Sequence, residues 1–293
     1  CSFAAERARN RQPEATSRQP EATNRQPQVA SHAPLASPLL PFTVPAASAP
    51  PTLRPAPLQV IAMHGWAGTA LGWEPWRQAA EARGWSWQSA ERGYGGASPS
   101  QPLWQPEGQR VLISHSMGLH LLPADRLAQA ERVVLLAGFG RFLPPGRAGR
   151  ALRAAMAGMA SALAEGPDPQ ESGLRAQALL RDFLAQAAAP DPASLMPPGP
   201  ADQPVAAEAR ARLRADLALL EATEDLPAGF PETVPVLLVE AGDDRIVAPA
   251  ARQLLAERLP GAARIVVEGA GHAFLSTPPL AAVLQWLERH PPP

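Results

Sequence analysis

A strand that runs directly into a tight turn stands near the middle of the chain: Val111-Leu112-Ile113-Ser114-His115-Ser116-Met117-Gly118. Its first three residues are apolar, as in a strand buried on both faces of a parallel sheet. Ser116 then lies between Ser114 and Gly118, two small residues that allow close approach of the strand and the segment after it. This pattern predicts a sharp turn that presents the Ser116 hydroxyl at the carboxyl end of the strand.

Apolar runs of the same kind recur on both sides of this turn, with helical patterns between them. The expected strands are Leu58 to Met63, Val111 to Ser114, Arg132 to Leu136, Val234 to Val239 and Ala263 to Val267. The expected flanking helices are Leu119 to Ala130, Ala250 to Leu259 and Leu280 to Arg289. This alternation predicts an α/β fold whose mostly parallel sheet, reduced to about six strands, is covered on both faces.

Residues 139–229 interrupt the alternation, because they hold several amphipathic stretches and no convincing strand. We therefore expect a helical cap over 139–229, inserted into a core made of 58–138 and 230–293. Residues 1–57 begin with short repeats and continue as a run rich in proline and alanine. Such a composition buries too little apolar surface to offset the entropy of ordering, so it predicts a disordered tail.

The charge and cysteine content excludes several classes of protein. The 26 basic and 27 acidic side chains nearly balance, which gives no global attraction for nucleic acid. Cys1 is the single cysteine, so no internal disulfide and no two-cysteine metal motif can form. No run approaches the roughly 18 apolar residues that cross a bilayer. We expect a cytoplasmic protein without metal or cofactor; a lipid anchor through Cys1 is the alternative.

Two more polar residues follow expected strands, and with Ser116 they form a candidate catalytic triad. Asp244, in the run Gly242 to Val247, comes after the fourth expected strand of the core and is the expected acid; Asp243 is the alternative. His272 comes after the last strand, on a loop rich in glycine, and is the expected base. A histidine activates a serine hydroxyl by accepting its proton, and a carboxylate fixes the tautomer of the histidine.

Two backbone N–H groups are the expected oxyanion hole of this site. His64-Gly65-Trp66 follows the first strand, so the N–H of Trp66 can join the N–H of Met117, which comes directly after the serine. The chain order of serine, acid and histidine is the one found on hydrolase sheets with a serine elbow.

Together these motifs resemble those of α/β hydrolases of the carboxylesterase kind, although Ser114 stands where the usual elbow has glycine. Within that superfamily, residues 58–290 resemble pimeloyl-[acyl-carrier protein] methyl ester carboxylesterases of biotin synthesis. The resemblance implies release of methanol from a methyl ester borne on a carrier protein. It also implies a set of substrate-binding residues, namely Trp66, Met117, Phe183, Leu184 and Gln186. Internal packing is the alternative for Phe183 and Leu184.

An acidic carrier protein would be attracted by a basic patch, and four arginines crowd the start of the expected cap: Arg141, Arg147, Arg150 and Arg153. A solvated helix face is the alternative for each of them, since every basic residue of the chain is an arginine. Two other functions remain open: a broad esterase or lipase acting on small esters, and a hydrolase-fold binding protein without activity. Retention of all three triad residues argues against the second.

Overall fold

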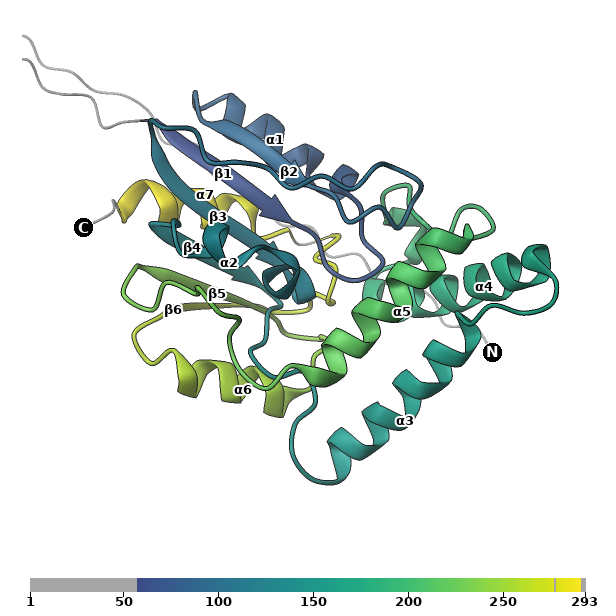
Figure 1. Ribbon diagram of the computed structural model, residues 1–293. Helices are drawn as coiled ribbons and strands as arrows, with labels where there is room; N and C mark the ends of the chain where they lie inside the picture. Colours follow the sequence, from purple (N-terminus) through teal and green to yellow (C-terminus); the bar gives the residue numbers. More distant parts are fainter. Residues whose placement is uncertain (1–56, 277, 291–293) are drawn as a thin grey trace, which may run out of the picture. The chain divides into compact units, whose positions relative to one another are not determined.

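Six strands form one all-parallel sheet in the computed structural model, which describes residues 57–276 and 278–290 (Figure 1). Their order across the sheet is β2-β1-β3-β4-β5-β6. The strands are β1 Leu58–Met63, β2 Ser86–Ala90, β3 Gln109–His115, β4 Arg132–Leu136, β5 Val236–Ala241 and β6 Ala263–Val267. The predicted α/β class and the reduced sheet are confirmed. The expected tail 1–57 lies outside the described residues, except for its last residue, Pro57.

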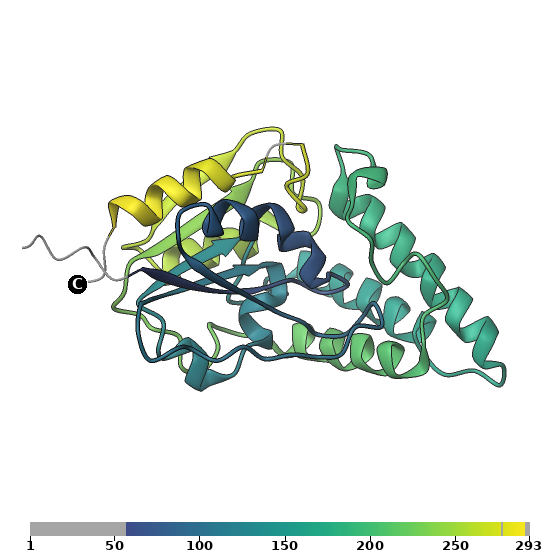
Figure 2. The same ribbon diagram turned by 90° about the horizontal axis from the view of Figure 1, so that it is seen from above.

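Successive strand residues point to opposite sides of the sheet. Because these residues are apolar, helices cover both faces. Val60 belongs to an apolar cluster with Trp76 and Trp286, which come from α1 (Glu74–Glu81) and α7 (Leu280–Arg289). Ile61 belongs to the other cluster, to which α2 (Ala124–Leu127) and α6 (Pro249–Arg258) contribute, the latter through Leu255. Figure 2 shows α1 and α7 together on one side of the sheet.

Strand β2 is the one element of the sheet that the sequence pattern does not predict. Its sequence, Ser-Trp-Gln-Ser-Ala, has three polar residues of five and lacks the β-branched residues of the other strands. It pairs only with β1, at the edge of the sheet, and most of its residues are partly exposed. An edge strand needs less apolar sequence than a central one, and its signal is therefore weaker.

The helix expected from Leu119 to Ala130 is wrong as a single element. A 3-10 helix, η2, covers Ser116–Leu121, and α2 covers only Ala124–Leu127. Leu122 between them is extended, with a ψ of 144°. The cause is Pro123, because proline has no N–H to donate and disfavours helical backbone in the residue before it.

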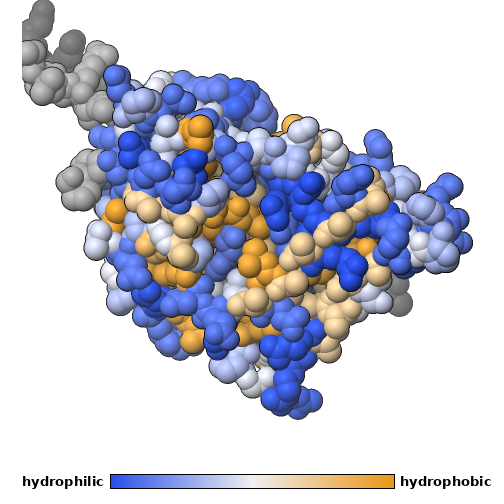
Figure 3. All heavy atoms as spheres, in the orientation of Figure 1, coloured by the Kyte–Doolittle hydropathy of each residue, from blue (hydrophilic) through white to orange (hydrophobic). Residues whose placement is uncertain are grey.

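A helical insertion separates β4 from β5, in the part of the chain where the sequence predicts a cap. It contains α3 (Arg147–Ala162), α4 (Pro169–Ala188), the 3-10 helix η3 (Ala193–Leu195) and α5 (Ala207–Ala222). Figures 1 and 2 show these helices beyond the carboxyl ends of the strands. The face drawn in Figure 3 is mostly hydrophilic, with apolar side chains gathered near its middle. Within the described ranges, no helix combines the length and the apolar character that spanning a bilayer requires.

Candidate active site

The serine turn at the end of β3 has the backbone geometry that its sequence predicts. Ser116 has a φ of 55°, a left-handed conformation that is strained for a residue with a side chain and is a recurring feature of functional sites. Gly118 permits the turn, because a Cβ there would clash with the carbonyl oxygen of Met63 at the end of β1. Gly65 is required for a similar reason: a Cβ at this position would lie 2.8 Å from the Cβ of Ser116.

The structure also brings Asp244 and His272 together at the carboxyl edge of the sheet. Asp244 Oδ2 lies 2.9 Å from His272 Nδ1, and both side chains are almost fully buried. The other carboxylate oxygen, Oδ1, accepts hydrogen bonds from the N–H groups of Ile246 and Val247 at 2.8 and 2.9 Å. With Nδ1 donating to the carboxylate, the neutral imidazole has Nε2 free to accept a proton.

The environment of Asp244 keeps its carboxyl group ionised. Burial by itself would raise the pKa of Asp244, but the charge and hydrogen bond of His272 and the two backbone N–H donors oppose it, and the pKa lies below its ordinary value of 3.8. Asp243, the alternative acid, is exposed, and its only described hydrogen bond is donated by its backbone N–H to the carbonyl of Ala270.

Ser116 is 7% exposed, and the residue before it, His115, contacts the histidine loop. Among the described residues, no hydrogen bond joins the Ser116 hydroxyl to His272. Bonds between a nucleophile and its base are often loose in a free enzyme and tighten when substrate binds. The pairing of Ser116 with His272 therefore stays a prediction.

His115 links the serine turn to the histidine loop, a role that the sequence analysis does not assign. Its Nε2 lies 2.9 Å from the carbonyl oxygen of His272, and the two imidazole rings are 4.9 Å apart between centroids. Burial lowers the pKa of His115 to about 3, so the ring is neutral and Nε2–H donates to the carbonyl. No pattern in the sequence could find this bond, because it depends on how two loops 157 residues apart meet.

The loop after β1 carries Trp66, whose backbone N–H is one of the two expected donors of the oxyanion hole. The N–H of Trp66 makes no hydrogen bond with any described residue. Met117 is the second residue of η2, and the N–H groups at the start of a helix have no partner within it. The indole of Trp66 donates from Nε1 to the carbonyl of Leu213 at 3.0 Å. Its ring packs edge-on against that of Phe183, with 4.8 Å between the ring centroids.

A cavity of about 360 Å³ opens beside these groups. His272, His115 and Trp66 line it on the side of the core, and Phe183 and Leu184 line it from α4. No aspartate, glutamate, lysine or arginine is among its lining residues, and most of the others are apolar. The cavity therefore suits an uncharged, apolar ligand, because a charged group there would lose its hydration without gaining a partner.

The five residues expected to bind substrate do not share one location. Trp66, Phe183 and Leu184 line the cavity, and their contact with substrate stays a prediction. Met117 is fully buried and is not part of the lining. Gln186 is exposed on α4, also outside the lining, so nothing in this geometry supports the contact expected of it. Within residues 57–276 and 278–290, no group of three or more His, Cys, Asp or Glu is arranged to hold a metal ion.

Comparison with known proteins shows similarity of structure and none of sequence. No protein-family model and no curated sequence matches the chain. The structure is similar to an esterase from Exiguobacterium antarcticum, with a TM-score of 0.57, 15% identity, and 80% of this chain and 93% of that chain covered. It is similar to a bromoperoxidase from Bacillus anthracis, with a TM-score of 0.54, 18% identity, and 80% and 93% covered. An E-2-(acetamidomethylene)succinate hydrolase gives a TM-score of 0.50, 19% identity, and 79% and 91% covered.

These similarities establish the fold. The chain has the α/β-hydrolase fold, as its sequence predicts, with an all-parallel sheet of six strands and flanking helices. At such low identities the comparison carries no information on substrate, and the resemblance to pimeloyl-carrier esterases stays a prediction.

Proposed function

We propose that the chain is a serine-dependent hydrolase of uncharged, apolar carboxylic esters. The observation that carries this proposal is the bond of 2.9 Å between Asp244 and His272, at the sheet edge where the strained Ser116 stands. The cavity beside these residues has room for a small ester, and the groups that line it carry no formal charge when the histidines are neutral. A buried carboxylate and histidine pair next to a strained serine is the arrangement that nucleophilic acyl transfer requires.

The reaction proceeds in two halves that use the same groups. Ser116 Oγ attacks the ester carbonyl while His272 Nε2 takes its proton, and the N–H groups of Trp66 and Met117 stabilise the negative oxygen. The tetrahedral intermediate expels the alcohol, which receives the proton from His272, and an acyl-enzyme remains. Water then attacks the acyl-enzyme, again with His272 as base, and the carboxylic acid leaves as Ser116 regains its proton.

Within this class we propose the methyl ester of a pimeloyl group on an acyl carrier protein as substrate. The methyl ester end is uncharged and apolar, which suits the cavity. Arg141 and Arg153 are paired with Glu224 and Glu221 at 3.6 and 2.8 Å. Arg147 and Arg150 are exposed and form no ion pair with a described residue, so an acidic carrier would be drawn mainly to these two.

Methanol release from pimeloyl-carrier methyl ester by the full chain tests this substrate. We expect Ser116-dependent release, with kcat/KM reduced severalfold in the double variant Arg147→Gln, Arg150→Gln and restored in part at low salt. A p-nitrophenyl ester without a carrier is the control, and its hydrolysis should be unaffected by the two arginine changes. If only the p-nitrophenyl ester is hydrolysed, the proposal of an ester hydrolase stands and the proposal of a carrier-borne substrate is refuted.

A broad esterase is the second candidate, and the rim of the cavity favours it. Leu71 of the 3-10 helix η1 (Ala70–Trp73) and Leu195 of η3 both line the cavity and are 58% and 52% exposed. Large apolar side chains at an open rim gain burial only when a ligand extends beyond the cavity. This arrangement suits esters with a chain that reaches the surface.

Substitution of Leu71 by aspartate should therefore change selectivity for chain length. We expect kcat/KM to fall about tenfold for a p-nitrophenyl octanoate and to stay within about twofold for the acetate, because roughly two methylene groups lose apolar contact. Leu103→Asp is the matched control, since Leu103 is 57% exposed and lies outside the lining. Equal losses on both esters would show that the rim does not select the chain.

A further inference from the structure

A buried cluster of charged and polar groups joins the helical insertion to the core, and the catalytic steps above make no use of it. Asp216 of α5 is 1% exposed. Its oxygens accept hydrogen bonds from Arg92 Nη2 at 2.6 Å, Arg92 Nε at 2.8 Å and the Tyr94 hydroxyl at 2.6 Å. A buried carboxylate is tolerated only when its oxygens are satisfied, and here three donors satisfy them.

The segment that reaches Asp216 also holds the oxyanion loop, which we define as residues 64–70. The backbone N–H of Arg92 donates to His64 Nε2 at 3.1 Å, and His64 Nδ1 donates in turn to the carbonyl of Gly65 at 2.9 Å. Glu91 accepts from the N–H of Ala70 at 2.9 Å. Residues 91–94 therefore contact the oxyanion loop at its beginning and at its end.

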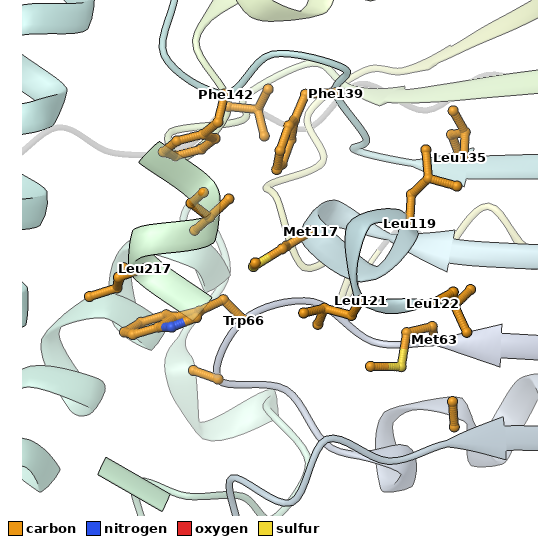
Figure 4. Packing of buried hydrophobic residues seen from close by; sticks show 14 of the residues in the cluster. Met63, Trp66, Met117, Leu119, Leu121, Leu122, Leu135, Phe139, Phe142 and Leu217 are labelled. Carbon is orange, nitrogen blue, oxygen red and sulfur yellow. The ribbon is translucent and has the colours of Figure 1, made fainter. Parts of the chain in front are cut away.

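Helix α5 contacts the same loop directly, one turn before Asp216. The carbonyl of Leu213 accepts the indole N–H of Trp66 at 3.0 Å, and Figure 4 shows Trp66 beside Leu217 of this helix. Arg212 of α5 donates to the carbonyl of Gly93 at 2.7 Å. Residues 213 and 216 lie on one face of the helix, so a single face of α5 holds both the loop and the segment behind it.

We propose that Asp216 is a positioning residue of the oxyanion hole. It acts through Arg92 and Tyr94, which fix the backbone of residues 91–94 against the oxyanion loop, and so places the N–H of Trp66 for the negative oxygen of the intermediate. This inference rests on the proposed function, because it assumes a tetrahedral intermediate at Ser116.

The physical case is that an oxyanion hole works only when its donors are already in place. A donor stabilises the developing charge because it need not reorganise during the reaction, and a small displacement loses much of that gain. Residues 64–70 form a loop except for the first residue of η1, and the backbone bond described within them runs from the N–H of Gly68 to the carbonyl of Gly65 at 3.1 Å. The bonds to α5 and to residues 91–94 restrain the loop further.

Kinetics of Asp216→Asn and Tyr94→Phe test the proposal. The amide keeps the shape of the carboxylate but replaces one acceptor with a donor that faces Arg92, and phenylalanine removes one bond to Asp216 without changing the ring. We expect kcat to fall about tenfold in Asp216→Asn and severalfold in Tyr94→Phe, with KM within about twofold. Glu221→Gln is the matched control, because Glu221 lies on the same helix in an exposed pair with Arg153 and should leave kcat unchanged.

A trifluoromethyl ketone that mimics the tetrahedral intermediate supplies the second readout. Its affinity should fall by the same factor as kcat/KM in each variant, which a general loss of packing would not produce. Two results would overturn the proposal: an unchanged kcat in both folded variants, or a raised KM with unchanged kcat. If Asp216→Asn does not fold, the kcat of Tyr94→Phe alone tests the proposal. Unaltered activity of Ser116→Ala would instead refute the proposed function on which this inference rests.

Discussion

Substitution of Ser116 by alanine should lower kcat for an activated ester by about 10⁴ to 10⁶-fold. Alanine keeps the Cβ and the turn but removes the only atom that can form the acyl-enzyme. Residual turnover would come from binding and from the N–H donors of the oxyanion hole. Steady-state hydrolysis of a p-nitrophenyl ester measures the loss, and a fluorophosphonate probe shows whether covalent labelling disappears with it.

Ser114→Ala is the matched control for this experiment. Ser114 lies two residues earlier, near the end of β3, is fully buried, and its hydroxyl has no hydrogen-bond partner among the described residues. Its removal should change kcat by less than about twofold, because an unpaired buried hydroxyl contributes nothing to hold the turn. Hydrolysis that survives in Ser116→Ala would refute the mechanism, and an inactive wild-type chain would favour a hydrolase-fold binding protein.

The apolar strands were predictable because a buried strand favours a run of apolar and β-branched residues. The bounds of β1, β4 and β6 agree with the expected ones at both ends. Strands β2 and β6 both lie at edges of the sheet, but β6 carries the run Ile265-Val266-Val267, whereas β2 has no β-branched residue and its sequence reads as a loop. The helix after Ser116 was expected to be continuous because its apolar spacing is helical, but one proline, Pro123, outweighs the spacing.

The candidate triad could be found because the ends of parallel strands meet at one edge of a sheet. A serine, an acid and a histidine after separate strands are then brought close by the topology alone. The bonds that Asp216 makes to Arg92 and Tyr94 span 124 and 122 residues of sequence, and they depend on how α5 docks against the core. No local pattern marks such a partner, because a helix with charged residues reads the same whether its acid is exposed or buried.

Asp244→Asn should lower kcat by about 10⁴-fold while leaving the site in place. The amide can accept the N–H groups of Ile246 and Val247 with its oxygen, but its NH₂ group then faces His272. The imidazole would turn its unprotonated nitrogen toward that group, leaving a proton on Nε2, where the base is needed. Turnover of a p-nitrophenyl ester and a crystal structure of the variant would check the loss and the retained geometry.

Asp243→Asn is the control that separates the two candidate acids. Asp243 is exposed beside Asp244, so its loss of charge should change kcat by less than about threefold. The opposite ranking of the two variants would make Asp243 the acid and contradict the bond seen between Asp244 and His272.

The pH dependence of stability gives an independent check on Asp244, because its pKa in the folded chain is lowered. A carboxylate with a lowered pKa stabilises the folded state above its ordinary value of 3.8, and this contribution disappears as the pH falls through the folded pKa. The free energy of unfolding of wild type should therefore exceed that of Asp244→Asn at pH 6, and the difference should shrink below pH 4. A difference that stays constant over this range would mean that the ionised carboxylate is not what holds His272. In that case the charge of Asp244 would not be needed for stability, and the loss of kcat in Asp244→Asn would have no electrostatic cause.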